Sequence, residues 1–566
     1  MMEIKPRRQW YKGTPLNEDG TPLTIFNWLD EPLEIPESEI EETIDVDVIV
    51  VGAGTAGVCA ARGAVEAGAT CVLFEKTKKV QARSGEFGIV SRSERIFEHY
   101  GIDGTEYAGD VVKEFTKQCT QRNDARVLKK WVDNCGATFD WYMEGYPEMY
   151  WCKDTLSPVP TDIKTWIQPT RYPAPEKYNW KDEYYPIFPC SIRISPGHTP
   201  VLQGNLDIAM ATGKLTWKPR HRVVKLLRDE ETGRMTGVIA QNYETDKYVR
   251  ANCAKGVVLS TGGYGGNPDM LDYYNPWARD EFAMPVSVDE RRVPGNCGDG
   301  LRLGMQIGGK CEDGPHAMID HAMGGSLLGC TPYLCLDENG ERFMNEEITG
   351  QQWGNRVNRL PGVRGFQIFD SSWPEQVGAM PSGHACVVGI VPDDSIYTNG
   401  VQRYDCNDSY TSLATVEEKV TNPKARRGAF VVRCDTIEEL VAALPISDEA
   451  KVTAKASIDR YNELAAKGVD EDFYKSSGRL FPIENGPFYA CQIGNGGILD
   501  AIGGLDSDAE CRVRDENLQI IPGLYAAGNC QGNRFKLEYP MVVPGISHSS
   551  CITFGRIAGT NCAKGI

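Results

Sequence analysis

The feature that most constrains the fold is a glycine-rich turn between a buried strand and a helix. The segment Asp45–Val51 is apolar and β-branched, which is typical of a strand buried on both faces of a parallel sheet. It leads directly into Gly52, Gly54 and Gly57, spaced as G-x-G-x-x-G, and a helical pattern begins at Val58. In such a turn the N-terminus of the helix can face a phosphate group.

The spacing of the three glycines indicates a dinucleotide site. The first glycine permits the tight turn, the second lets a pyrophosphate approach the backbone, and the third lets the helix pack closely on the strand. A second strand, Cys71–Phe74, ends at Glu75, where a carboxylate can accept hydrogen bonds from ribose hydroxyls. The segment therefore predicts a βαβ unit that binds a dinucleotide.

Length and charge limit the class of protein. A chain of 566 residues is too long for a single hydrophobic core, so we expect roughly two to four domains. The net charge of −18 argues against a nucleic-acid partner, because phosphate binding needs a local excess of Lys and Arg. No apolar run approaches the roughly 18 residues of a membrane span, so we predict none.

Two features that could suggest export or metal binding lack the necessary context. Arg7 and Arg8 look like a twin-arginine signal, but the residues after them are polar and form no apolar region. We therefore expect a polar N-terminal arm over residues 1–43 and a cytoplasmic protein. The 19 cysteines include no C-x-x-C pair, so we predict no metal site.

The rest of the chain predicts a mixed fold. Its patterns indicate helices over 107–144, Ile437–Leu444 and Asp448–Ala466, a β-meander over 215–249 and a strand over Lys255–Ser260. Prolines in the aromatic-rich stretch Tyr150–Cys190 predict an ordered loop. These aromatic side chains could either surround an apolar substrate or pack two domains together, and the sequence leaves both possibilities open.

Several distant segments share motifs with one flavoprotein family. They are Thr261-Gly262-Gly263, Gly298-Asp299-Gly300, Asn339–Glu346, Ile502–Leu505 and Pro522–Asn529. From Asp45 to the C-terminus the chain resembles fumarate reductases, succinate dehydrogenase flavoprotein subunits and ketosteroid dehydrogenases. The resemblance implies FAD as the cofactor and an α/β fold. It also implies a doubly wound Rossmann-type FAD-binding domain with a β-meander, interrupted by an α+β capping domain.

The resemblance and the composition suggest four segments. After the arm, the first part of the FAD-binding domain covers 44–332, with a helical and aromatic insertion over about 107–195. The capping substrate domain covers 333–488, and 489–566 form the second part of the FAD-binding domain. The residues predicted to bind FAD are Gly52, Gly54, Ala56, Gly57, Glu75, Lys76, Ser84, Gly85, Val224, Thr261, Gly262, Gly263, Asp299, Gly528, Asn529, Gly545, Ile546 and Ser547.

Positions that fumarate reductases use to bind and protonate a dicarboxylate are changed. By the resemblance, Asp500 replaces a histidine and Gly350 replaces the proton-donating arginine, while Arg356 lies nearby but out of register. A negative charge at position 500 would repel a dicarboxylate, which disfavours fumarate. His321 lies close to the position of a second histidine and is a candidate catalytic group, although a structural histidine fits its context equally well.

The segment before the last helix resembles ketosteroid dehydrogenases instead. Tyr539-Pro540 precedes Gly545, with a two-residue insertion before Thr553. In those relatives a tyrosine hydroxyl and a glycine N–H bind the ketone oxygen, where negative charge develops. We therefore predict an FAD-dependent oxidoreductase that reduces, or introduces, a carbon–carbon double bond conjugated to a ketone. The expected substrate is small and apolar, a 3-keto steroid or a bile-acid-like molecule, and an anaerobe is the expected source.

Two alternatives remain. One is a reductase of a small unsaturated acid, such as fumarate, urocanate or a cinnamate, with a carboxylate clamp built from Arg356 or Arg534. The other is a flavin electron-transfer subunit without a small substrate. Because the sequence shows no second redox centre, we expect electrons from a separate donor, NAD(P)H or a redox protein.

Overall fold

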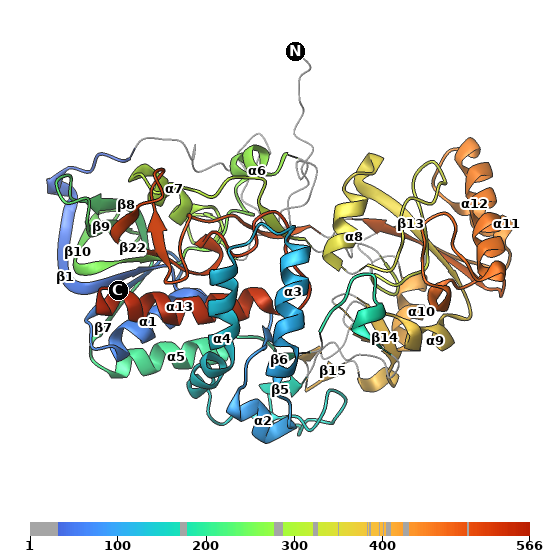
Figure 1. The fold of residues 1–566 in the computed structure, drawn as a ribbon, viewed down its shortest axis with the longest axis horizontal. Helices are drawn as coiled ribbons and strands as arrows, with labels where there is room; N and C mark the ends of the chain where they lie inside the picture. Colours follow the sequence, from blue (N-terminus) through green and yellow to red (C-terminus); the bar gives the residue numbers. More distant parts are fainter. Residues whose placement is uncertain are drawn as a thin grey trace, which may run out of the picture.

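The computed structural model describes residues 32–169, 178–188, 190–276, 287–320, 326–348, 350–381, 383, 386–395, 397–399, 401–402, 409–422, 429–494 and 497–566. The protein has a mixed α/β fold with two lobes, which confirms the predicted fold class at this level (Figure 1). The larger lobe contains both ends of the described chain, and the smaller lobe is formed by the middle of the sequence.

The larger lobe is built on an eight-stranded sheet. Its parallel strands lie in the order β22 (Ile520–Ala526), β10 (Tyr248–Leu259), β1 (Ile40–Val51), β2 (Cys71–Glu75) and β7 (Leu215–Pro219). The antiparallel strands are β21 (Arg512–Arg514), at the edge, and β8 (His221–Arg228) and β9 (Met235–Asn242), which form the expected meander with β10. The first and last parts of the chain thus share one sheet.

The central strand β1 is buried on both faces, as its sequence predicts. Val48 and Val50 pack into the core formed with helices α1 (Thr55–Glu66), α5 (Thr199–Ala211) and α13 (Ile546–Lys564). Ile49 and Val51 face the opposite core, which includes β8, β9 and α7 (Asp299–Gln306). Alternation with a period of two therefore places successive side chains in two separate cores.

The insertion is more regular than expected. The sheet β3 (Glu86–Gly88), β6 (Ser191–Ser195), β5 (Trp166–Pro169) and β4 (Tyr150–Trp151) is flanked by α2 (Glu94–Tyr100), α3 (Ala108–Gln118) and α4 (Ala125–Tyr142). The stretch expected to be loop therefore contributes two strands, because β5 pairs with β4 on one side and with β6 on the other. Helix α6 (Pro268–Tyr274) follows β10.

The smaller lobe, here called the cap, has its own antiparallel sheet. Its strands are β12 (Leu334–Leu336), β13 (Arg364–Asp370), β19 (Phe488–Gly494) and β18 (Val431–Cys434), in that order. The boundary expected at 488 falls at the start of β19, so the cap sheet continues to Gly494. Two further strands, β11 (Ala317–Asp320) and β20 (Ile498–Ile502), pair with each other, and their buried residues pack in the cores of the larger lobe.

Helices complete the cap. Helices α11 (Ile437–Ala443) and α12 (Asp448–Lys467) occupy the two amphipathic segments predicted from the sequence. Thr436 and Glu439 form a capping box that begins α11, and Gly468 in the left-handed region ends α12. The remaining cap elements are α8 (Gly350–Val357), α9 (Trp373–Gln376), α10 (Leu413–Thr421), β14 (Val387–Ile390), β15 (Tyr397–Thr398), β16 (Val401–Gln402) and β17 (Ser409–Thr411).

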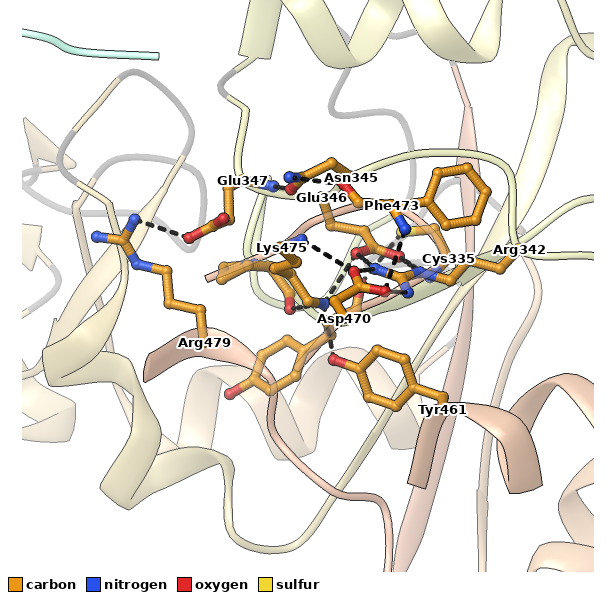
Figure 2. A network of polar contacts seen from close by, with 12 residues as sticks. Cys335, Arg342, Asn345, Glu346, Glu347, Tyr461, Asp470, Phe473, Lys475 and Arg479 are labelled. Carbon is orange, nitrogen blue, oxygen red and sulfur yellow. Dashed lines mark hydrogen bonds and ion pairs between the residues drawn. The ribbon is translucent and has the colours of Figure 1, made fainter. Parts of the chain in front are cut away.

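A buried ion network lies at the centre of the cap (Figure 2). Lys475 and Glu346 have fully buried side chains, and Lys475 Nζ donates to Glu346 Oε2 at 2.8 Å and to the Tyr461 hydroxyl at 2.7 Å. Arg342 bonds Glu346 and Asp470 in a bidentate manner. Burial opposes ionisation of Glu346, but Lys475 and Arg342 outweigh it and hold the pKa of Glu346 below its usual range.

The Glu346→Gln variant is expected to lose about 3–5 kcal/mol of stability, because it leaves Lys475 buried without a carboxylate partner. The shift of the urea midpoint of the FAD-loaded protein measures this loss. The matched control is Asp459→Asn, which removes the exposed pair with Lys455 and should cost less than about 1 kcal/mol. Equal midpoints for the two variants would contradict the importance of the buried network.

Candidate functional site

The glycine turn has the shape that a pyrophosphate requires. Gly52 has φ +94°, and a Cβ added there would lie 2.7 Å from the Ser260 carbonyl oxygen. A Cβ at Gly57 would overlap the Gly52 carbonyl oxygen, so the strand and the helix approach too closely for a side chain. A Cβ at Gly54 would meet nothing within 4 Å. Of the three glycines, only Gly54 has open space beside it, and this is the glycine that a pyrophosphate is expected to approach. The glycine turn therefore fits FAD.

Glu75 is anchored to the same turn. Its Oε2 accepts a hydrogen bond from Ala53 N at 2.7 Å, and its Oε1 accepts from Thr77 N at 2.8 Å and from Thr77 Oγ1 at 2.9 Å. These contacts place the carboxylate at the end of β2, next to the glycine turn. A carboxylate oxygen can accept more than one hydrogen bond, so Glu75 can still bind a ribose hydroxyl. This contact with the ribose stays a prediction.

Lys76 and Asp299, both predicted to bind FAD, bind each other. Lys76 Nζ lies 2.9 Å from Asp299 Oδ2, and Arg222 Nη2 lies 2.6 Å from Asp299 Oδ1. Burial opposes ionisation of Asp299, but the two cations outweigh it and hold its pKa well below its usual range. The carboxylate also stands in the first turn of α7, where a negative charge is favourable. Their contact with FAD stays a prediction.

Asp500 is buried among hydrogen-bond donors rather than facing a substrate. Its carboxylate accepts hydrogen bonds from Gly263 N at 3.2 Å, Gly265 N at 3.1 Å, Asn296 Nδ2 at 3.2 Å and Asn529 Nδ2 at 2.7 Å. Burial raises the pKa of Asp500. The residue therefore holds together the loops that follow β10 and β22, which explains why a carboxylate replaces the histidine expected from the resemblance.

Arg534 is a buried cation connected to Asp500 through an amide. Its Nη2 donates to Asn529 Oδ1 at 3.0 Å, and its Nη1 donates to Ser550 Oγ at 2.7 Å. It forms no ion pair with a carboxylate of the described residues, and Asn529 bridges it to Asp500. The guanidinium group thus connects the loop after β22 to the first turns of α13.

Tyr539 lies beside the N-terminus of α13. Its hydroxyl accepts a hydrogen bond from Ser547 N at 3.2 Å, and its ring packs edge-on against Phe535. Within the described part of the chain, its O–H proton has no acceptor. Gly545 precedes the helix with φ +78°, and a Cβ there would lie 2.6 Å from Phe87 N. The hydroxyl therefore contacts Ser547 N rather than Gly545 N, which is the N–H expected to pair with it.

The other residues predicted to bind FAD lie around the same strand ends. Ser84 donates to Glu86, Thr261 Oγ1 accepts from Gly300 N at 2.8 Å, and a Cβ at Gly528 would lie 2.8 Å from Ala56 Cβ. Gly85, Val224, Gly262 and Ile546 lie near the β6 carbonyl groups, in β8, after β10 and at the start of α13, respectively. Contact of each with FAD stays a prediction.

One of the predicted catalytic residues, Arg356, does not join this site. Arg356 lies on α8 with an exposed side chain, because α8 buries Gln352, Trp353 and Val357 instead. Its predicted catalytic role therefore finds no geometric basis. His321 lies outside the described residues.

Contacts between the cap and the larger lobe were missed by the sequence analysis. Arg479 of the cap forms a bidentate ion pair with Glu183 of the insertion, at 2.6 and 2.8 Å, and also binds Glu347 at 3.2 Å. Asn355 Nδ2 lies 3.0 Å from both carboxylate oxygens of Glu538. No sequence signal could have found these pairs, since their partners are more than a hundred residues apart.

The comparisons define the class of protein. The model of the FAD binding domain family matches residues 47–541, and the chain belongs to this family. Vinyl phenol reductase of Lactiplantibacillus plantarum is 25% identical over 92% of this chain and 96% of that protein. Urocanate reductase of Eggerthella lenta is 24% identical over 96% of this chain and 79% of that protein.

A solved structure shares the fold. The 3-ketosteroid-Δ4-(5α)-dehydrogenase from Rhodococcus jostii RHA1 superposes with a TM-score of 0.66 at 20% identity, over 94% of this chain and 100% of that one. The predicted family, the FAD cofactor and the class of enzyme, an FAD-dependent oxidoreductase acting on CH–CH bonds, are thereby confirmed. In the described part of the chain, no helix is both long and apolar enough to cross a membrane.

The open space beside Gly54 gives a test of FAD binding. Gly54→Ala should fold, because its backbone is extended and nothing obstructs a Cβ, but the methyl group should lower FAD affinity at least about tenfold. Titration of the apoprotein with FAD, followed by flavin fluorescence, measures the change. Gly109→Ala, which also enters open space, serves as the control and should bind FAD normally.

Proposed function

We propose that this flavoenzyme reduces, or introduces, a carbon–carbon double bond conjugated to a ketone, and that its substrate is a 3-keto steroid or a bile-acid-like molecule. The observation that carries the proposal is the position of Tyr539. Its hydroxyl lies at the N-terminus of α13 with a proton that no described residue accepts.

Tyr539 is suited to bind a ketone oxygen. Bound FAD supplies the hydride chemistry at the substrate carbon. As negative charge develops on the ketone oxygen, the Tyr539 hydroxyl donates a hydrogen bond to it. The hydrogen bond from Ser547 N to the same hydroxyl oxygen strengthens this donor, because connected hydrogen bonds polarise one another. The Gly545 N–H, which donates to no described residue, is the second donor in this proposal.

The comparisons support this type of chemistry. A vinyl phenol reductase and a urocanate reductase are relatives over most of the chain, and the fold resembles that of a dehydrogenase bound to 4-androstene-3,17-dione. We propose a cytoplasmic location, an anaerobic source, and a separate electron donor, NAD(P)H or a redox protein.

A second candidate function is the reduction of a small unsaturated acid. Arg534 favours it, because this buried cation has no carboxylate partner among the described residues and lies in the loop that leads to Tyr539. Against it, three of its nitrogens already donate to Asn529, Ser550 and Gln531, which leaves less of the guanidinium for a carboxylate.

The choice between the two functions is tested by anaerobic stopped-flow reoxidation of the reduced flavin. We expect rapid reoxidation by a 3-keto-4-ene steroid and slow reoxidation by fumarate and urocanate. The reason is that Asp500, which is bonded to Asn529, replaces the histidine with which fumarate reductases bind a substrate carboxylate. Rapid reoxidation by an unsaturated acid alone would contradict the proposal and identify Arg534 as the residue to mutate.

Removal of the Tyr539 hydroxyl tests the catalytic role directly. Tyr539→Phe should slow reoxidation by the enone about 100- to 1,000-fold, as expected for loss of one oxyanion donor. The ring and its contact with Phe535 remain, so FAD binding and reduction by dithionite should not change. The control is Tyr474→Phe, at an exposed position, and an unchanged rate in Tyr539→Phe would rule out the role.

The protonation of Tyr539 predicts the pH dependence. Burial raises the pKa of this hydroxyl above its usual value, so the proton needed for donation stays bound as the pH increases. We therefore expect no loss of the reoxidation rate from a tyrosine ionisation between about pH 8 and 10. A fall in rate in this range that is absent from Tyr539→Phe would contradict the expectation.

A further inference from the structure

The loop that carries Tyr539 is held at several points by the larger lobe. Cys119, directly after α3, contacts the Glu538 carbonyl oxygen at 3.6 Å, and Phe188 N donates to the Val542 carbonyl oxygen at 2.8 Å. Ser547 N donates to the Tyr539 hydroxyl itself at 3.2 Å. These contacts fix the backbone on both sides of the tyrosine.

One cap residue also reaches this loop. Asn355 lies on α8, and its Nδ2 is 3.0 Å from both carboxylate oxygens of Glu538, the residue directly before Tyr539. Glu538 thus brings a side chain of the Tyr539 loop into direct contact with a helix of the cap. The Glu538 side chain therefore links α8 of the cap to the backbone that carries the tyrosine.

We propose that Asn355 is a positioning residue, which aligns the Tyr539 hydroxyl for a substrate ketone when α8 lies against the Tyr539 loop. This inference rests on the proposed role of Tyr539. Its physical basis is geometric, because the Asn355 amide binds a side chain whose Cα is one peptide unit away from the tyrosine. A displacement of a catalytic group by about 1 Å can reduce a rate about 100-fold, so a single contact of this kind can control turnover.

A different contact holds the cap in place. The Arg479–Glu183 ion pair joins the cap to the insertion, and neither residue belongs to the Tyr539 loop. Loss of Asn355 therefore leaves the cap attached at Arg479 and changes chiefly the position of the tyrosine. This separation makes the positioning effect measurable without opening the cap.

The first experiment uses FAD-loaded Asn355→Ala. We expect reoxidation by the 3-keto-4-ene steroid to slow about tenfold, with KM changed less than about twofold, since the donor is misplaced rather than the substrate released. The matched control is Asn462→Ala, which removes two amide hydrogen bonds to Ile483 inside the cap. It should lower the stability of the cap but leave the reoxidation rate unchanged. An equal loss of rate in both variants would overturn the proposal.

A double-mutant cycle separates this inference from the proposed function. If Asn355 acts through Tyr539, Asn355→Ala should have no further effect in the Tyr539→Phe background. If Tyr539→Phe slows the reaction and the two effects multiply, the positioning role is wrong but the tyrosine role survives. If Tyr539→Phe alone has no effect, the proposed function fails.

A further measurement does not depend on activity. Because Ser547 N donates to the Tyr539 hydroxyl, its amide hydrogen should exchange faster in Asn355→Ala than in the wild type or Asn462→Ala. The swap Asn355→Asp with Glu538→Gln exchanges donor and acceptor and should restore both the rate and the protection. Unchanged amide exchange at Ser547 would overturn the proposal. So would a slow Asn355→Asp variant whose reoxidation rate is not restored by adding Glu538→Gln.

Discussion

The close approach of backbone segments at the glycine turn is the constraint on which the structure depends. Gly57 packs on the Gly52 carbonyl group, Gly52 packs on Ser260, and Gly555 of α13 packs on the Ala56 carbonyl group. Each contact excludes a side chain, and together they bring β1, β10, α1 and α13 to one point. The open space at Gly54 and the position of Tyr539 at the start of α13 both follow from this packing.

The cap uses a different means of stabilisation. Its sheet is covered by amphipathic helices, but its centre holds a buried lysine, an arginine and two carboxylates in mutual contact (Figure 2). Such groups are stable only when all their partners are present, and their geometry tolerates little rearrangement. The network therefore joins several segments of the cap, and the polar contacts at Arg479 and Asn355 attach the cap to the larger lobe.

The sequence predicts local features better than distant contacts. The strand before Gly52 and the helices α11 and α12 are correct because period and capping residues are encoded within each segment. The strand β5 was missed because it is four residues long and is defined by its pairing with β4 and β6 rather than by a pattern of its own. Proximity to a motif favours Arg356 as a catalytic residue, but its side chain is exposed on α8. The neighbouring side chain of Asn355 contacts Glu538 instead.

The central sheet also governs how the chain can assemble during synthesis. Strands β1, β2 and β10 can pair once the first half has emerged, but β22 and α13 are made last and complete both the sheet and the core against α1. Until then α1 has an uncovered apolar face, a state prone to misassociation in large proteins. A nascent chain of this protein thus remains unable to bury that face until its final helix has been translated.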